Sequence, residues 1–310
     1  MFKKYRKALL VFVATLSIFA GCNNKPVDEN PTSSSTEEVQ EAKEVEGGQR
    51  VTDVLYSENL KLDWNYTIYL PKDYDENKEG GYPVLYMLHG LGGNHTNLLE
   101  RFDSVEILDE IIEKAGKDML VVFPDGFNSF YINQNDGMQM EDAVMKDLVP
   151  FIDSYYNTNT DRSMRAIGGI SMGGYGAARF ILKYPQTFSK ALLISPAVWY
   201  KLPEDNPIKM NYHAFAKGDK SWSDEFYQSL HPSSYIENAE DVEFYIRTTS
   251  GDQTVDVEDV KKFASELDKA SVKNEFIIDP DEFDHNWDYW KTIADDFYKW
   301  TLDAFYESKE

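Results

Sequence analysis

The 310-residue chain is poor in cysteine and in basic side chains. Its one cysteine, Cys22, excludes an intrachain disulfide, a CxxC redox motif and a cysteine-rich zinc site. The 31 basic residues against 54 acidic ones give a formal charge of −23, which excludes nucleic acid as the main partner and otherwise serves solubility. No segment repeats at a fixed period, so solenoids and propellers are excluded. The 42% of hydrophobic residues can still build a sizeable core, held together by packing alone.

The first 22 residues have the pattern of an export signal. Four basic residues lie among positions 3–7, and an apolar run follows at 8–20. A run of this length is short for a membrane span and typical of a secretory signal. Its ending, Ile-Phe-Ala-Gly-Cys at 18–22, is similar to a bacterial lipobox, which implies cleavage before Cys22 and lipidation of its thiol. We expect a lipoprotein signal peptide at 1–21 and a lipid-anchored, extracytoplasmic protein. The alternative is an uncleaved anchor helix with a chance cysteine.

A polar segment separates this signal from the rest of the chain. Residues 22–48 are rich in Ser, Thr, Glu, Asn and Pro and low in aromatics. Such a composition buries too little apolar surface to offset the entropy of ordering. We therefore predict an acidic, disordered tether at 22–48 and one globular domain at 49–310.

The globular part alternates between strand-like and helix-like patterns. Apolar, β-branched runs of strand length occur at 62–70, 84–89, 119–124, 164–169, 191–195, 242–248 and 275–279. Apolar residues recur at helical spacing in 142–155, 175–183, 257–267 and 287–305. This alternation predicts an α/β fold with a mostly parallel central sheet and helices on both faces. The segment 196–240, rich in Trp, Tyr, Lys, Asp and Pro, interrupts it as a small lid insertion.

The strongest local motif is Gly-Ile-Ser-Met-Gly-Gly at 169–174, between a predicted strand and a predicted helix. A Gly-x-Ser-x-Gly in that context forms a nucleophile elbow, which exposes the serine oxygen on a strained turn above the sheet. A side chain at Gly169 or Gly173 would collide where strand and helix approach each other. The motif predicts Ser171 as a catalytic nucleophile.

A serine hydroxyl needs a base, and in this arrangement the base comes last in the chain. Three histidines follow Ser171. His213 and His231 fall in the lid, where surface or structural roles are expected. His285 lies after the last predicted strand and before the C-terminal helix, where a loop can bring it over the serine. We predict His285 as the base.

The base in turn needs an acid that orients it. Asp252 follows the predicted strand at 242–248, at the edge of the sheet where catalytic groups gather. We predict Asp252 as the acid. Its rivals are more simply explained as a helix N-cap or a solvated acidic loop: Asp256, Asp279, Asp281 and Asp284. The acidic stretch 279–284 lacks the ligand spacing and glycine of a calcium loop, so neither a metal nor a cofactor is expected.

A glycine-rich turn after the strand at 84–89 completes the predicted site. The sequence His-Gly-Leu-Gly-Gly at 89–93 can aim a backbone N–H at the oxyanion formed on a substrate carbonyl. We predict the backbone amides of Leu91 and Met172 as the oxyanion hole. His89 itself is expected to brace the loop.

Together these motifs resemble the esterase D-like branch of the α/β-hydrolases, which includes feruloyl and acetyl xylan esterases. The matching segments are Tyr-Met-Leu-His-Gly-Leu-Gly-Gly at 86–93, Phe-Pro-Asp-Gly at 123–126, the elbow at 169–175, Gly251-Asp252, and His-Asn-Trp-Asp-Tyr-Trp at 285–290. The resemblance covers residues 50–308 and implies carboxylic-ester hydrolysis through an acyl-enzyme. One departure concerns the catalytic histidine, which the family often precedes with Gly-x and this chain with Phe283-Asp284.

The substrate is less sharply indicated. An outward-facing protein favours an external ester, free or linked to a polysaccharide, such as an acetylated or feruloylated carbohydrate. Aromatic residues in the lid and upper loops, Trp199 and Tyr131 among them, can stack on sugar or aryl groups. No obligate protein partner is indicated. Two alternatives remain: acyl transfer to a sugar hydroxyl, as in related mycolyltransferases, and a non-catalytic lipoprotein that binds glycans.

Overall fold

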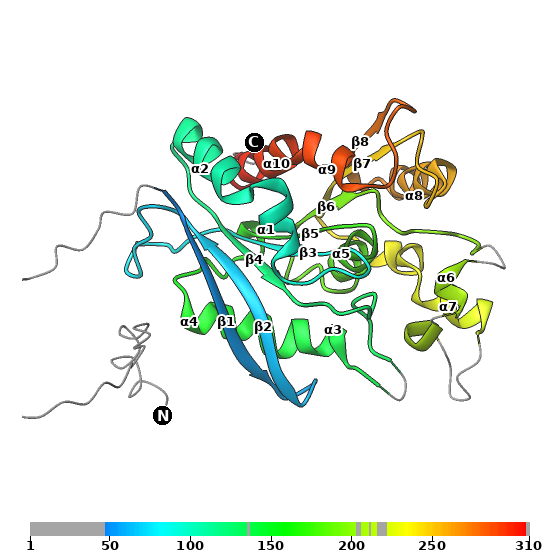
Figure 1. The fold of residues 1–310 in the computed structure, drawn as a ribbon, viewed down its shortest axis with the longest axis horizontal. Helices are drawn as coiled ribbons and strands as arrows, with labels where there is room; N and C mark the ends of the chain where they lie inside the picture. The colour runs from blue at the N-terminus through cyan, green and yellow to red at the C-terminus, as the bar shows by residue number, and fades with distance from the viewer. Residues whose placement is uncertain (1–46, 135–136, 203–205, 211, 216–221, 308–310) are drawn as a thin grey trace, which may run out of the picture. The chain divides into compact units, whose positions relative to one another are not determined.

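The computed structural model describes residues 47–134, 137–202, 206–210, 212–215 and 222–307. In this part of the chain, eight strands form one sheet with helices on both of its faces (Figure 1). The strands are β1 (Gln49–Ser57), β2 (Leu62–Leu70), β3 (Val84–Leu88), β4 (Leu120–Pro124), β5 (Arg165–Ile170), β6 (Lys190–Ile194), β7 (Glu243–Thr249) and β8 (Lys273–Asp279). Their order across the sheet is β1-β2-β4-β3-β5-β6-β7-β8.

The sheet is mostly parallel, as the sequence predicts. Strands β4, β3, β5, β6, β7 and β8 pair in parallel, whereas β1 pairs with β2 and β2 with β4 in antiparallel fashion. Every residue of β3, β4, β5 and β6 is buried, because helices cover both faces of the central strands. The carboxyl ends of these parallel strands share one edge of the sheet, where loops from distant parts of the sequence meet.

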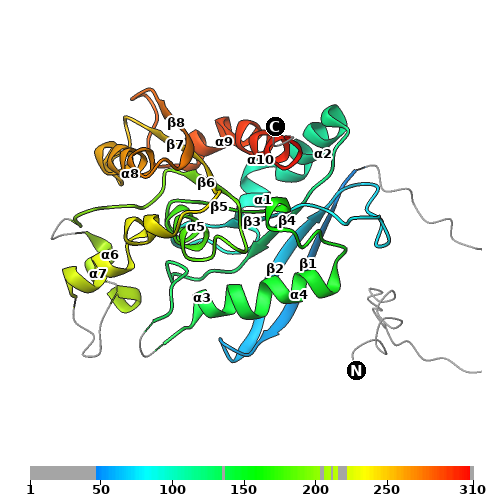
Figure 2. The same cartoon turned by 180° about the vertical axis from the view of Figure 1, so that it is seen from behind.

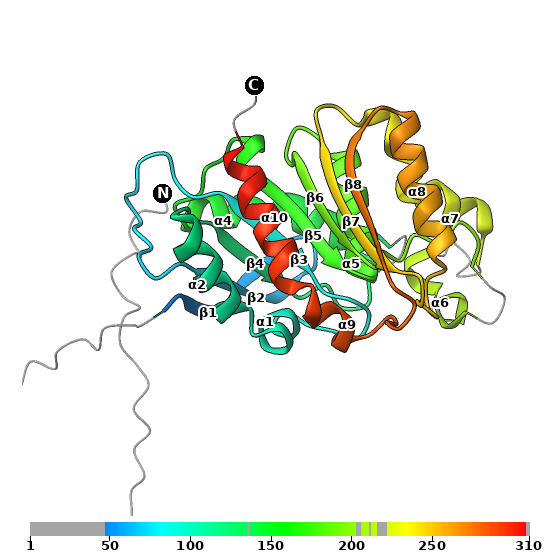
Figure 3. The same ribbon diagram turned by 90° about the horizontal axis from the view of Figure 1, so that it is seen from above.

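Helices divide between the two faces (Figures 2 and 3). One face packs against α1 (Asn97–Phe102), α2 (Ser104–Ala115), α9 (Trp287–Thr292) and α10 (Ala294–Tyr306). The other packs against α3 (Met140–Asp142), the π-helix η1 (Ala143–Leu148), α4 (Val149–Tyr155), α5 (Met172–Lys183) and α8 (Val257–Lys269). A short 3₁₀ turn, η2 (Arg162–Met164), precedes β5. Each face has its own apolar cluster, so the sheet is the wall between two halves of the core.

The helix predicted at 142–155 forms, but with a wide turn inside it. The backbone N–H of Val149 donates to the carbonyl of Val144, five residues back. The next residue, Pro150, has no N–H to donate, and in a regular helix its ring would clash with the carbonyl four residues back. The wide turn of η1 lies directly before Val149 and Pro150, where it avoids this clash.

The C-terminal helix predicted at 287–305 is two helices. Helix α9 ends at Thr292, whose hydroxyl donates to the Tyr289 carbonyl at 2.7 Å. Ile293 then leaves helical geometry, with φ −117° and ψ 7°, before α10 begins at Ala294. Both helices bury their apolar residues in the same cluster. The apolar stripe is therefore continuous in the sequence, although the helix axis is not.

The predicted lid at 196–240 contains α6 (Pro207–Met210), η3 (Tyr212–Phe215), α7 (Asp224–Leu230) and η4 (Pro232–Asn238). Positions 203–205, 211 and 216–221 of it lie outside the described residues. Both ends of the lid are tied to the nucleophile's helix. The Ala197 N–H donates to the Ser171 carbonyl at 3.0 Å, and the Leu230 carbonyl accepts from Tyr175 at 2.7 Å and from Arg179.

A buried group of charges fixes α5 from below the site. The Glu141 carboxylate accepts from Arg179 at 2.7 Å, from Tyr184 at 2.6 Å and from Lys183. Glu141 and Arg179 are only 5% and 2% exposed. Burial opposes ionisation of Glu141, but Arg179, Lys183 and Tyr184 outweigh it and lower the pKa of this carboxyl. Through Arg179, this charge group connects α3, α5 and the end of α7.

The predicted signal peptide at 1–21, Cys22 and the predicted tether as far as residue 46 lie outside the described residues. The globular domain is expected to start at residue 49, and β1 begins there. Among the described residues, no helix has both the length and the apolar character needed to span a bilayer.

Candidate active site

Ser171 occupies a strained turn between β5 and α5. Its backbone angles are φ 54° and ψ −113°, a region that residues with a side chain rarely adopt and that costs about 1–3 kcal/mol. Three backbone hydrogen bonds hold the turn: the Ser171 N–H donates to Ile194 at 2.9 Å, and its carbonyl accepts from Tyr175 and Ala197, each at 3.0 Å. The side chain therefore stands clear of the sheet, at the start of a helix.

The glycines around Ser171 are required by close packing. A Cβ at Gly169 would lie 2.4 Å from the backbone of Gly173, and a Cβ at Gly173 would lie 2.1 Å from the Leu88 carbonyl oxygen. Contacts this short force the backbone apart. Glycine at these two positions is what allows β3, β5 and α5 to converge under the serine.

Ser171, His285 and Asp252 lie in one hydrogen-bonded chain. The Ser171 Oγ is 2.8 Å from His285 Nε2, and His285 Nδ1 is 2.7 Å from Asp252 Oδ2. The other oxygen of Asp252 accepts from the backbone N–H groups of Thr254 and Val255, each at 2.8 Å. Asp252, an acceptor on both oxygens, holds the imidazole with its proton on Nδ1, which leaves Nε2 free to accept from the serine. The structure thus brings together three side chains that the sequence separates by up to 114 positions.

The loop that carries His285 is held by Asp284 and Gly251. A Cβ at Gly251 would lie 2.2 Å from the Phe283 carbonyl oxygen, so the acid loop and the histidine loop cross in direct contact. Asp284 Oδ1 accepts from the Gln253 N–H at 2.9 Å and from the His285 N–H at 2.7 Å. These two bonds lower the pKa of Asp284. The close crossing of the two loops therefore requires glycine at position 251, while Phe283 and Asp284 precede the histidine.

The interpretation of the rival aspartates as an N-cap or a solvated loop is right for three of them and wrong for Asp279, which ends β8. Asp256 caps α8, accepting from the Glu258 N–H at 2.9 Å. Asp281 and Asp284 are exposed in the loop, where Asp284 also bridges two loops. Asp279 accepts from Arg247 and Tyr289, each at 2.7 Å. A single sequence shows acidic residues in a loop but not the backbone N–H groups that will face them.

The two predicted oxyanion donors lie beside Ser171. Met172 is the first residue of α5, and the N–H groups of a helix's first turn have no partner within the helix. Gly90 is so close that a Cβ there would lie 3.5 Å from the Ser171 Cβ, and Leu91 follows it. In the described part of the chain, nothing accepts from the Leu91 N–H. Both amides are therefore available to the oxyanion that forms on the substrate carbonyl when its carbon bonds to Ser171.

His89 braces the glycine-rich loop, as expected. Its Nε2 accepts from the Gly126 N–H and its Nδ1 lies against the Gly90 carbonyl, both at 2.7 Å. Because Nε2 is an acceptor, Nδ1 carries the proton and donates it to Gly90. Asn128 adds a second link, its Oδ1 accepting from the Gly92 N–H at 2.8 Å. The loop that carries the Leu91 amide is thus held from two sides.

Tyr131 does not line the pocket above Ser171, although the sequence suggests it as a substrate contact. It is 1% exposed, and its hydroxyl donates to the His89 carbonyl at 3.2 Å. Trp199 does line the pocket. Its indole N–H donates to the Thr254 carbonyl at 3.0 Å, which ties the start of the lid to the acid loop.

His231 has a structural role in the lid. Its Nδ1 accepts from the Ser233 N–H at 3.2 Å, and its Nε2–H donates to the Val198 carbonyl at 3.3 Å. Burial is the main cause that lowers the pKa of His231, to about 4, so the ring is neutral at ordinary pH. Residue 213 belongs to η3, and its side chain lies outside the described structure.

A cavity of ≈ 370 Å³ opens over Ser171 and His285. Its walls are mostly apolar and come from the glycine-rich loop, the loop after β4, the start of α5, the lid, the loop of Asp252 and the start of α9: Gly90, Leu91, Phe130, Met172, Trp199, Asn206, Ile208, Thr254, Asn286, Trp287 and Trp290. Trp290 packs edge-on against His285, with ring centroids 5.0 Å apart. Helical spacing alone predicts Trp290 as a core residue and gives no sign of its contact with His285.

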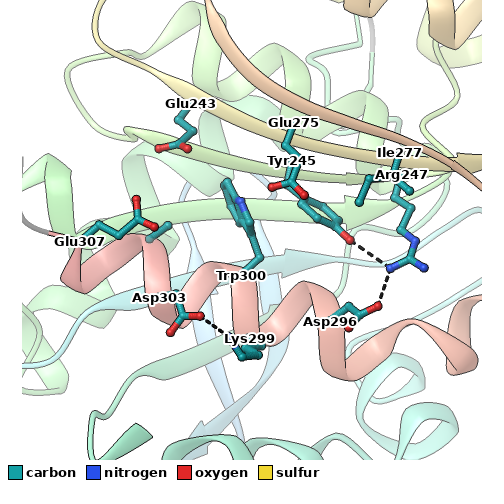
Figure 4. A pocket seen from close by; sticks show the side chains of 11 residues that line it. Glu243, Tyr245, Arg247, Glu275, Ile277, Asp296, Lys299, Trp300, Asp303 and Glu307 are labelled. Atoms are coloured by element: carbon teal, nitrogen blue, oxygen red, sulfur yellow. Dashed lines mark hydrogen bonds and ion pairs between the residues drawn. The ribbon is translucent and has the colours of Figure 1, made fainter.

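A second cavity lies between β7, β8 and α10 (Figure 4). Four of its charged side chains pair with one another: Arg247 with Asp296 at 2.6 Å, and Lys299 with Asp303. Glu243 pairs with Lys273, which does not line the cavity, at 2.6 Å. The ring of Trp300 is tilted against that of Tyr245, with centroids 5.4 Å apart. Among the residues described, this cavity is lined by no serine or histidine, whereas Ser171 and His285 both line the first cavity.

Comparison with known proteins agrees with this geometry. A family model named Esterase, with the description "Putative esterase", matches residues 57–295. An acetyl esterase of Caldicellulosiruptor saccharolyticus is 27% identical over 79% of this chain and 95% of its own length. An endo-1,4-beta-xylanase/feruloyl esterase of Xylanibacter ruminicola is 30% identical over 56% of this chain, which corresponds to 24% of that larger protein.

A solved structure of a ferulic acid esterase has the same fold. Its TM-score is 0.69 at 24% sequence identity, over 83% of this chain and 98% of the other. Together with the strand order and the elbow at Ser171, this similarity establishes the α/β-hydrolase fold.

Proposed function

Because this chain belongs to the esterase family and is a serine esterase, we propose that it hydrolyses acetylated or feruloylated carbohydrate, or another short-acyl ester, at the cell surface. The observation that carries the proposal is the chain of hydrogen bonds from Ser171 through His285 to Asp252, on the wall of a largely apolar cavity. An acetyl esterase and a feruloyl esterase among the relatives support these two acyl classes.

In the proposed reaction, His285 Nε2 takes the proton of Ser171 as its Oγ attacks the ester carbonyl. The amides of Leu91 and Met172 then hold the oxyanion. His285 returns the proton to the leaving alcohol oxygen, which departs and leaves an acyl group on Ser171. Water attacks this acyl-enzyme with His285 again as base, releasing the acid and restoring the serine. Asp252 keeps the imidazole oriented through both halves.

The test is a panel of esters that differ in their acyl group. We expect the purified protein to hydrolyse at least one of acetylated xylo-oligosaccharide, feruloylated arabinose or a short-chain glyceryl ester, because the cavity of ≈ 370 Å³ accepts a small acyl group. Chromatography of the products also separates hydrolysis from transfer, since a sugar acceptor that gains the acyl group indicates a transferase. Absence of turnover on the whole panel would refute the proposal.

The location at the cell surface rests on the sequence around Cys22, which is also the only cysteine. We expect Cys22→Ser to prevent lipidation, because the thiol is the group that carries the lipid. In a detergent-partitioning assay of cells, the variant should move from the detergent phase to the aqueous phase or accumulate as precursor. Unchanged partitioning would contradict a lipid anchor at this position.

A further inference from the structure

Two asparagines in the wall of the catalytic cavity have their side-chain oxygens already occupied. Asn286 Oδ1 accepts from the Tyr289 N–H at 3.0 Å, and Asn206 Oδ1 accepts from the Ile208 N–H at 2.9 Å. Both residues line the cavity that contains Ser171 and His285. One comes from the loop before α9 and the other from the lid.

These bonds fix which way each amide faces. A backbone N–H needs an acceptor, so the oxygen of each carboxamide must face the backbone and the NH₂ group must face away from it. Within the described residues, nothing accepts from either NH₂ group. Asn206 and Asn286 therefore offer oriented hydrogen-bond donors in a cavity whose other walls are mostly apolar.

The position of Asn286 indicates which part of the ester it meets. In the proposed reaction, His285 returns its proton to the leaving alcohol oxygen, so the alcohol must lie on the imidazole side of Ser171. Asn286 follows His285 directly, and the half-buried ring of Trp287 comes next. The predicted oxyanion donors, Leu91 and Met172, mark the carbonyl side. Asn286 thus faces the alcohol rather than the acyl group, and Asn206 lines the same cavity from the lid.

An alcohol that uses these donors must carry further oxygen atoms near the ester bond. Sugar hydroxyl and ring oxygens meet this requirement, whereas a simple alkyl alcohol does not. From this arrangement we propose that Asn286 and Asn206 form a subsite for the sugar that carries the acyl group, and that they determine the preference for sugar esters over alkyl esters. This assignment rests on the proposed function and specifies its alcohol.

The test compares two esters with the same acyl group, taken from the panel as one that the wild type hydrolyses. One ester has methanol as its alcohol and the other has the primary hydroxyl of methyl arabinofuranoside. The variants are Asn286→Ser and Asn206→Ser. Serine keeps an oxygen that can accept from the backbone N–H, so the local turn is retained, but it has no NH₂ group. Asn159→Ser is the matched control, because Asn159 Oδ1 caps Asp161 in the same way at 3.0 Å and does not line the catalytic cavity.

We expect the ratio of kcat/KM for the sugar ester to that for the methyl ester to fall about threefold to tenfold in each cavity variant, as for the loss of one hydrogen bond. Asn159→Ser should keep the wild-type ratio. An unchanged ratio in both cavity variants, or an equal loss on both esters, would overturn the subsite while leaving the esterase proposal intact. A wild type that hydrolyses the methyl ester but not the sugar ester would also overturn the subsite alone, whereas one that hydrolyses no ester of the panel would overturn both.

Discussion

Ser171→Ala is expected to lower kcat by at least about three orders of magnitude on any ester that the wild type hydrolyses, because removing one member of a nucleophile-base-acid unit disables the whole unit. The fold should survive. The strained turn is held by backbone hydrogen bonds with Ile194, Tyr175 and Ala197, none of which needs the hydroxyl. Steady-state kinetics on a 4-nitrophenyl ester measure the effect.

The matched control is Ser154→Ala. The Ser154 hydroxyl is exposed on α4 and donates only to the Phe151 carbonyl, at 2.8 Å, so its loss should leave turnover within about twofold of wild type. A fluorophosphonate probe gives an independent readout, since it should label the wild type and Ser154→Ala but not Ser171→Ala. A Ser171→Ala protein with wild-type turnover would show that another residue is the nucleophile.

Glu141→Gln is expected to lower the free energy of unfolding by about 3–5 kcal/mol, because it leaves the guanidinium of Arg179 buried without a counter-charge. For a domain of this size the loss corresponds to a fall in Tm of about 10 °C. Urea unfolding at pH 7 measures the difference. Glu110→Gln is the control, since Glu110 and Lys114 form a pair with side chains 65% and 73% exposed, and such pairs contribute about 0.3–0.5 kcal/mol.

The same variant should change the response to acid. The folded protein lowers the pKa of Glu141 below its ordinary value of 4.5, so the ionised carboxylate favours the folded state above that pH. This contribution is lost as the pH falls further and the folded-state carboxylate takes up a proton. The difference in the free energy of unfolding between the wild type and Glu141→Gln should therefore become smaller in acid. A difference under 1 kcal/mol at pH 7 would mean that Arg179 finds another partner.

The central strands could be predicted from the sequence because they are buried on both faces. A strand such as β3, with no exposed residue, appears as an unbroken apolar run that no helix pattern explains. Strand β1 was not predicted for the opposite reason. It lies at the edge of the sheet and exposes one face, but Asp53 faces inward and Val54 outward, which breaks the polar-apolar alternation that marks a half-buried strand. Pairing with β2 gives it its structure.

Helices α1 and α2 also escaped the sequence analysis. Helix α1 has only six residues and ends at Asp103, whose φ is 55°, so it is too short for a periodic pattern. Helix α2 has twelve residues with Val105, Leu108 and Ile112 at helical spacing, a pattern that the prediction left out. For the site, the motif order was enough to name Ser171, Asp252 and His285 as residues that should meet. The motif order could not predict which contacts hold the loops that carry these residues. Asp284 and Gly251 act through backbone groups of a distant loop, and no local pattern marks such a contact.

The attachment of the lid has a consequence for how such a protein can diversify. At its start, the Ala197 N–H donates to the carbonyl of Ser171. Further along, the carbonyl of Leu230 accepts from Tyr175 and Arg179. Sequence changes between these two attachment points can change the shape of the cavity above Ser171 without moving the serine hydroxyl. Mutational libraries confined to positions 201–223, which leave Trp199 and its bond to the acid loop in place, should thus yield altered substrate range far more often than inactive protein.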